Sequence, residues 1–76
     1  MALAATLHDA SGALRHDVER LLPRLQALYR DVAVATSPPT DARVRALLAS
    51  AGVHAGTPPS NRRGPLYRLA LRRALA

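Results

Sequence analysis

The residues of this sequence best suited to binding chemistry lie near its end, in the segment SNRRGP at residues 60–65. It combines an amide side chain and two guanidinium groups with a proline at a predicted helix start. Helix N-terminal amides and guanidinium groups both favour an anion, above all a phosphate. Arg68 lies one turn further along and would join them if its side of the helix faces the same way. We therefore predict an anion site formed by Asn61, Arg62, Arg63 and, on that condition, Arg68.

The distribution of charge favours an anionic partner for the second half of the chain. Residues 1–41 hold four Arg and five acidic residues, a net charge of −1, whereas residues 42–76 hold seven Arg and no acidic residue, a net charge of +7. Such asymmetry is typical of chains that meet a negatively charged partner. The alternative is an ordinary solvent-exposed role for each arginine, because all eleven basic residues are Arg and charged side chains are mostly exposed.

Two histidine–aspartate neighbours, His8-Asp9 and His16-Asp17, suggest acid–base or metal chemistry. No two histidines have the i, i+4 spacing of a helical metal site, and no Gly-x-Ser-x-Gly elbow accompanies them. The chain has no cysteine, which excludes thiolate metal sites and disulfides. Its four glycines form neither a dinucleotide-binding fingerprint nor a Walker loop, which argues against a dinucleotide-binding Rossmann domain or an NTPase. We expect no catalytic residue here.

Hydrophobic periodicity predicts the elements that position these residues. Apolar side chains recur with helical spacing over residues 14–29, and Pro23 either kinks this helix or marks a shorter one that begins near Arg20. Thr40 is expected to cap a second helix that ends before Gly52, and Pro65 to take the first position of a third. Short extended segments are expected over residues 2–7, 32–35 and 53–57.

This order of elements predicts an α/β fold for a single domain over residues 1–76. Three short parallel strands alternate with three helices, β-α-β-α-β-α, in three layers that resemble half of a Rossmann-like sheet. Helical crossovers bring the carboxyl ends of parallel strands to one edge, where open α/β sheets bind ligands. The repeated exits VAVATSPPTD at 32–41 and VHAGTPPSNRRG at 53–64 place their prolines and polar residues at that edge.

The order of motifs resembles the N-terminal part of a nucleotide-diphospho-sugar transferase domain, as in the family 2 glycosyltransferases. In that family a second strand ends in a pattern close to Val-Asp-Asp-Gly-Ser-Thr-Asp, and a third leads through an Asn- and Gly-containing loop into a helix with Arg and Ala. Here ATSPPTD at 35–41 stands in the place of the first pattern. NRRG at 61–64, followed by YRLALRRA at 67–74, stands in the place of the second.

The resemblance implies a nucleotide-diphospho-sugar as partner. Nucleoside contacts would come from side chains at the ends of the first two strands: Thr6, His8, Asp9, Thr36 and Ser37. The arginines would face the diphosphate: Arg62, Arg63 and Arg68.

The family's Asp-x-Asp strand, which holds a divalent Mg or Mn ion, would follow Ala76, so we expect no cofactor in this chain. We predict a fragment that does not transfer sugar alone and that self-associates through an exposed sheet edge.

Two alternatives remain at the level of sequence. The first is a small, basic, Arg-rich protein that presents Arg68, Arg72 and Arg73 to nucleic acid. The second is a helical interaction module, which requires residues 2–7 and 32–35 to be helical or disordered. No apolar run approaches the length of a membrane span, and residues 1–12 lack the basic start of a signal peptide. We therefore expect a cytoplasmic protein.

Overall fold

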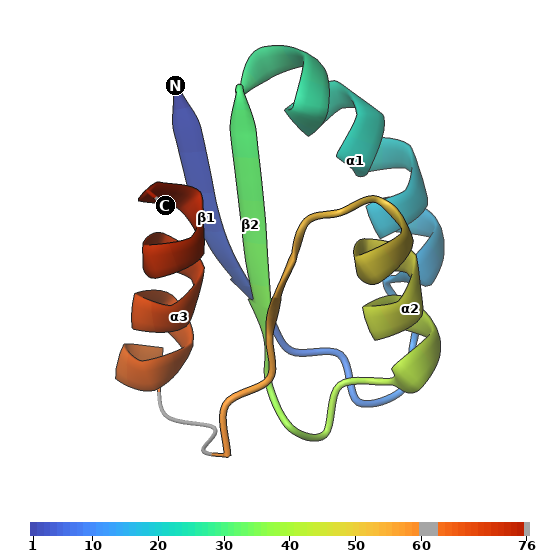
Figure 1. The fold of residues 1–76 in the computed structure, drawn as a ribbon. Helices are drawn as coiled ribbons and strands as arrows, with labels where there is room; N and C mark the ends of the chain where they lie inside the picture. The colour runs from blue at the N-terminus through green and yellow to red at the C-terminus, as the bar shows by residue number, and fades with distance from the viewer. Residues whose placement is uncertain (60–62, 76) are drawn as a thin grey trace.

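The computed structural model describes residues 1–59 and 63–75, without the side chains of Arg63 and Leu66. Three strands alternate with three helices along the chain (Figure 1). Their bounds are β1 Ala2–Leu7, α1 Arg15–Leu28, β2 Asp31–Thr36, α2 Ala42–Ser50, β3 His54–Gly56 and α3 Arg63–Leu75.

The strands form one parallel sheet in the order β1-β2-β3. β1 and β2 pair along their whole length, from Ala2 opposite Asp31 to Leu7 opposite Thr36. β3 pairs with β2 over a shorter stretch, with an irregularity in register between Val34 and Ala35. The predicted α/β fold is confirmed, including its parallel strands and their β-α-β-α-β-α order. The helical interaction module is not supported, because residues 2–7 and 32–35 are extended.

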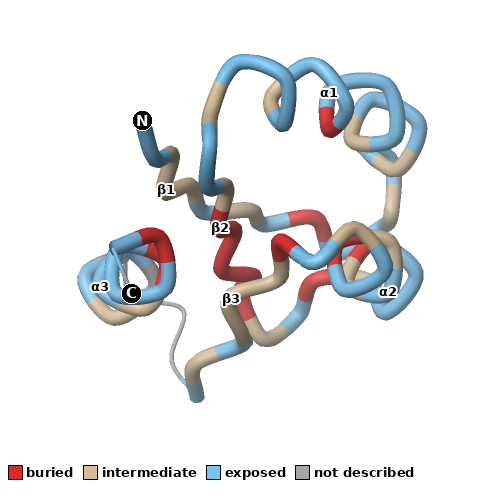
Figure 2. The backbone as a smooth tube through the Cα atoms, turned by 45° about the horizontal axis from the view of Figure 1, so that its top comes forward, coloured by how far each residue is buried: buried red, intermediate tan, exposed pale blue. Residues whose placement is uncertain are grey.

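Helices cover both faces of the sheet, with α1 and α2 on one side and α3 on the other (Figures 1 and 2). The alternation of Val and Ala in β2 accounts for this arrangement, because successive side chains of a strand point to opposite faces. Val32 and Val34 contact the core under α1 and α2. Ala35 packs with Ala70 of α3 on the other face. The large β2 side chains therefore face two helices and the small ones face a single helix.

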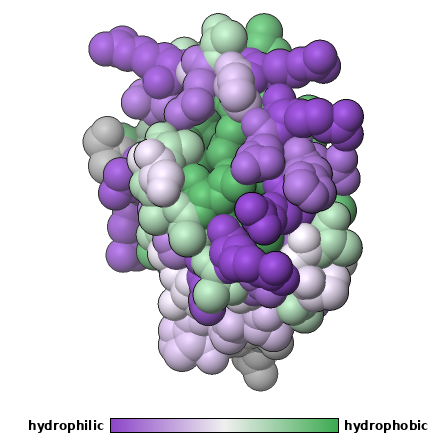
Figure 3. Space-filling view, turned by 90° about the vertical axis from the view of Figure 1, so that its right-hand side faces the viewer, coloured by the Kyte–Doolittle hydropathy of each residue, from purple (hydrophilic) through white to green (hydrophobic). Residues whose placement is uncertain are grey.

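The main core lies between the sheet and the α1–α2 layer. Its buried members are Leu22, Val34, Val44, Leu48 and Val53. The second core is smaller and built mostly from alanine, with Ala70 of α3 completely buried against β2. Figure 3 looks onto the α1–α2 layer and shows apolar side chains in a hollow framed by polar ones.

Three predicted helix boundaries need correction. α1 begins at Arg15 and runs through Pro23 as one helix, so the shorter helix from Arg20 is wrong. Pro23 is exposed, and the neighbouring Leu22 is buried in the core, which favours continuing the helix despite the lost backbone bond. α3 begins at Arg63, two residues earlier than predicted. Pro65 therefore stands third in the helix, still in the first turn, where backbone N–H groups have no partner within the helix.

The cap of α2 is Asp41, and the prediction of Thr40 is wrong. The Asp41 carboxylate accepts a hydrogen bond from the backbone N–H of Arg43 at 2.8 Å. Thr40 is unavailable for capping because its hydroxyl donates to the Leu7 carbonyl and bonds to Ser37.

None of the helices within residues 1–59 and 63–75 combines the length and the apolar character that a membrane crossing requires.

Candidate functional site

The carboxyl ends of all three strands lie along one edge of the sheet, at the bottom of Figure 1. We call this edge the rim and define it by residues 7–9, 36–40 and 54–58. The start of α2 also reaches the rim, because the Asp41 backbone N–H donates to the Asp9 carbonyl at 2.8 Å. The two predicted strand exits, at 32–41 and 53–64, thus lie at the same edge as the turn after β1. The structure describes the second exit as far as Pro59.

Side-chain hydrogen bonds join the end of β1 to the end of β2. The Nδ1 atom of His8 lies 2.7 Å from the Ser37 hydroxyl oxygen. That oxygen lies 2.8 Å from the Thr40 hydroxyl oxygen, and the Thr40 hydroxyl donates to the Leu7 carbonyl at 3.3 Å. The Leu7 carbonyl also accepts from the Ser37 backbone N–H at 3.0 Å. This chain of hydrogen bonds fixes the Nδ1 edge of the His8 imidazole and holds the two strand ends together.

A second set of bonds joins the end of β2 to the end of β3. The Thr36 hydroxyl oxygen lies 3.0 Å from Nε2 of His54 and 2.8 Å from the Thr57 hydroxyl oxygen. Thr36 is completely buried. It follows Val32 and Val34 in the strand alternation, so its side chain points to the α1–α2 side of the sheet. His54 and Thr57 therefore come to the rim already oriented by a buried hydroxyl.

Burial separates the rim into an inner and an outer layer. The inner hydroxyls of Thr36, Ser37 and Thr40 are at most 2% exposed, whereas His8 and Thr57 are exposed and His54 is half-buried. No buried side-chain nitrogen or oxygen in the described part of the chain lacks a hydrogen-bond partner. A ligand at the rim would therefore first contact the imidazoles of His8 and His54 and the Thr57 hydroxyl. Thr36 and Ser37 would not contact it directly but would hold the two imidazoles in place.

Asp9 has a structural role in the turn that leads into α1. Its carboxylate accepts three backbone N–H groups, from Gly12 and Ala13 at 3.1 Å and from Leu14 at 3.0 Å. The residue is only 6% exposed. The backbone donors at this helix start, which would otherwise suit an external anion, already surround an internal carboxylate.

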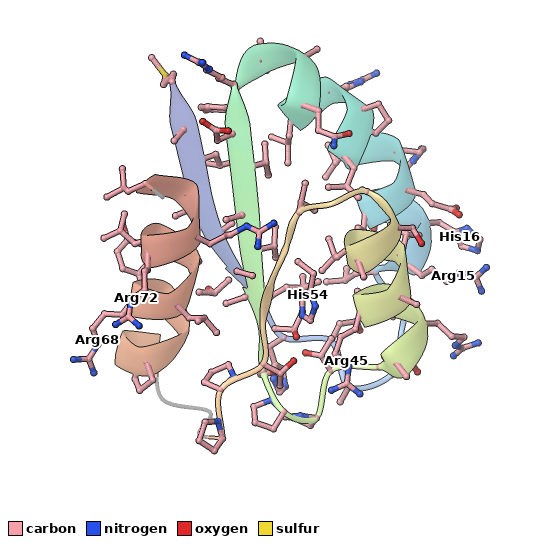
Figure 4. The ribbon with its side chains drawn as sticks, in the orientation of Figure 1. Arg15, His16, Arg45, His54, Arg68 and Arg72 are labelled. Carbon is pink, nitrogen blue, oxygen red and sulfur yellow. The ribbon has the colours of Figure 1, made fainter. Side chains whose placement is uncertain are left out.

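Arg45 of α2 and the imidazole of His54 in β3 lie beside the rim. Burial lowers the pKa of His54 below its ordinary value, and the positive charge of Arg45 lowers it further. Figure 4 shows Arg45 and His54 next to each other near the lower end of the sheet. The Arg43 side chain donates to the Asp41 carboxylate at 3.1 Å, which lowers the pKa of Asp41. Neutral His54 beside a permanently charged guanidinium is an arrangement that suits an anion.

The predicted arginine clamp is only partly placed. Asn61, Arg62 and the Arg63 side chain lie outside the described residues. Arg68 is exposed, and its Nε donates to the Gly64 carbonyl at 3.3 Å. Figure 4 shows its side chain on the outer side of α3, pointing away from the sheet. The structure therefore does not bring Arg68 together with His8 and Ser37.

The other predicted residues differ in accessibility. Thr6 is exposed and belongs, by strand alternation with Ala4, to the α3 side of β1. Thr40, His54, Thr57 and Arg45 were missed by sequence reasoning. Thr40 and Thr57 could have been found, since each flanks a Pro-Pro pair at a strand end, whereas nothing in the sequence connects Arg45 with His54.

Within residues 1–59 and 63–75, no three His, Asp or Glu side chains gather as a metal site. Comparison of the chain with protein family models, curated proteins and solved structures found no match.

Proposed function

We propose that the rim is the nucleoside-diphosphate side of a nucleotide-sugar site, and that this chain binds such a nucleotide without transferring its sugar. The observation that supports the proposal is the convergence of three strand ends whose outer polar side chains are held in place by hydrogen bonds. Open parallel sheets bind ligands outside their carboxyl ends. His8 and His54 offer imidazole nitrogens there, Thr57 offers a hydroxyl, and Arg45 supplies a positive charge.

The mode of binding follows from the accessibility of these groups. Phosphate oxygens accept hydrogen bonds, so we expect the diphosphate to lie across His8 and Thr57, near Arg45. Asp9 would act indirectly by holding the turn that carries His8, because its carboxylate is already surrounded by backbone donors. Thr36 and Ser37 would fix the orientations of His54 and His8. The role proposed for these residues is binding, and none of them is assigned to the transfer of sugar.

An NMR titration of the isotope-labelled chain with uridine and guanosine diphosphate sugars tests the proposal. Amide shift changes should concentrate at the ends of the three strands. His8→Ala should weaken binding roughly fivefold, the loss expected for one hydrogen bond of about 1 kcal/mol. His16→Ala is the matched control, since His16 is exposed on the outer side of α1 (Figure 4). Equal effects of both variants, or shift changes away from the rim, would contradict the proposal.

Nucleic acid is a second candidate ligand, favoured by one observation on α3. Arg68 and Arg72 lie one turn apart, both are exposed, and both are on the outer side of the helix in Figure 4. Such a face could contact successive phosphates without reading bases. The distinguishing measurement is binding to heparin over a range of salt concentrations. A steep salt dependence that Arg72→Ala reduces, without any binding of diphosphate sugars, would favour this function over the nucleotide site.

A further inference from the structure

β1 forms an edge of the sheet that carries none of the usual protection against pairing. It pairs with β2 on one side, and the described residues place no strand on the other. The segment Ala2–Leu7 contains no charged residue and no proline. Natural edge strands are commonly protected by charges, prolines or bulges. The outer edge of β1 is therefore open to another strand.

An apolar stripe on α1 runs alongside this open edge. Leu14, Leu21 and Leu28 are spaced by seven residues, which places them on one side of the helix, and they are between 41% and 74% exposed. The side of α1 nearest α2 is marked by Gln26, whose side chain donates to the Ala51 carbonyl. The leucine stripe faces away from that contact. It borders grooves in which Leu7 and Val18 also take part.

α3 carries a matching stripe on the opposite face of the sheet. Tyr67, Leu71 and Leu75 recur every four residues and are at least 37% exposed. Leu69 packs toward β3, because a side chain at Gly56 would meet it at 3.1 Å. Leu71 lies two residues further on, about 200° around the helix, and therefore points away from β3 toward β1. Figure 2 shows β1 at the end of the sheet with α3 and α1 on either side.

We propose that the face formed by the α1 stripe, the edge of β1 and the α3 stripe binds a second copy of the same chain. The two β1 strands would lie antiparallel about a twofold axis. An isologous interface needs a self-complementary surface. Antiparallel pairing of α1 centred on Leu21 brings Leu14 of one copy to Leu28 of the other. The same alignment brings Asp17 beside Arg24 of the second copy. Asp17 and Arg24 line one groove with Leu21, so they lie on the same flank of the stripe.

Asp17 already pairs with Arg20 of its own helix at 2.9 Å. Arg24 of a second copy would add a further opposite charge beside it, which favours a second copy over an unrelated apolar partner. A twofold axis produces the Asp17–Arg24 contact twice, once at each end of the α1 pair. The antiparallel arrangement also points the two rims in opposite directions, so that both remain open. The dimer is therefore independent of the nucleotide site proposed above.

Sedimentation or light scattering of the purified chain tests this proposal. At millimolar concentration the wild-type protein should have the mass of two chains. Asp17→Arg and Arg24→Asp should each raise the dimer dissociation constant by roughly tenfold or more, because each places like charges together at both ends. An equal mixture of the two variants should associate again as a heterodimer, in which every contact pairs opposite charges. Ala49→Arg, on the exposed side of α2, is the control and should leave the dimer intact.

Leu28→Lys provides a second measurement that does not depend on the charge pair. Leu28 is 74% exposed, so the variant should keep its fold, as judged by circular dichroism, and lose the dimer. A monomeric wild-type chain would overturn the proposal. So would a dimer that survives Leu28→Lys, or variants with reversed charges that fail to associate when mixed.

Discussion

Replacing Asp9 tests whether an internal carboxylate holds together the turn between β1 and α1. In the fold its Oδ1 atom accepts N–H groups from Gly12 and Ala13, and its Oδ2 atom accepts one from Leu14. Asp9→Ala removes both acceptor oxygens, and with them all three hydrogen bonds, and leaves the partly buried N–H groups of Gly12 and Leu14 without that acceptor. Asp9→Asn keeps one oxygen, which can still accept from Gly12 and Ala13, but turns an amide nitrogen toward Leu14. The two variants therefore remove different numbers of hydrogen bonds from the same place.

The expected magnitudes follow from that count. A hydrogen bond contributes about 1 kcal/mol to stability, and more when an unpaired donor remains buried. Asp9→Ala should therefore lower the free energy of unfolding by about 2–3 kcal/mol, and Asp9→Asn by about 1 kcal/mol. For a chain of this size the alanine variant should melt on the order of 10 °C lower. Urea unfolding followed by circular dichroism measures both differences.

The alanine variant should also gain a response to anions. The N–H groups of Gly12 and Leu14 lose their acceptor, while that of Ala13 keeps the Ser11 hydroxyl at 3.3 Å. Together these N–H groups form a small cradle at the start of a helix, which suits sulfate or phosphate. Sulfate stabilises proteins in general, so the comparison must be with another destabilised variant. Sulfate should restore more stability to Asp9→Ala than to Leu48→Ala, whose defect lies in the apolar core, when chloride of equal ionic strength is the reference.

Two results would refute this reasoning. If Asp9→Ala unfolds within about 0.5 kcal/mol of the wild type, the range of ordinary surface changes, the carboxylate does not support the turn. If sulfate stabilises the Asp9 and Leu48 variants equally, the three donors do not form an anion cradle. Equal losses in Asp9→Ala and Asp9→Asn would also contradict the count of hydrogen bonds.

Three further predictions concern the core, the α3 contact and pH. Leu48→Ala should cost about 2–5 kcal/mol, measured by urea unfolding, because the side chain is only 1% exposed. Gly56→Ala should cost about 1–3 kcal/mol in the same assay, since Gly56 has φ of +132° and a Cβ there would press on Leu69. Burial and Arg45 lower the pKa of His54, so the unfolded chain binds its proton more readily. Stability should therefore fall as pH drops below about 6.5, the ordinary pKa of histidine, and Arg45→Gln should reduce that fall.

The fold was largely predictable because hydrophobic spacing encodes it directly. The uncharged run over residues 32–35 predicts a strand, and the structure adds that its larger Val and smaller Ala side chains pack on opposite faces of the sheet. Helix boundaries were less predictable, because several residues can satisfy the same donors. Thr40 and Asp41 are both good caps, and only the tertiary bonds of Thr40 to Leu7 and Ser37 decide between them.

The meeting of the polar strand ends was predictable, but the accessibility of their side chains was not. The sequence places polar residues at each strand end, yet it does not show which hydroxyls turn inward. Thr36 shares the inward parity of Val34, so its burial could have been read from the alternation. The pairing of His54 with Arg45 depends on how α2 lies beside β3, a long-range arrangement that local spacing does not encode.

The small alanine core between α3 and the sheet affects how the chain unfolds. Ala35 and Ala70 let the helix approach the sheet closely, but their methyl groups remove little apolar surface from water compared with Leu48 or Val44 on the other face. Separating α3 from the sheet should therefore require less free energy than separating the α1–α2 layer. Amide hydrogens of α3 should therefore exchange with solvent through a partial opening that leaves the remaining layers closed, well before the whole chain unfolds.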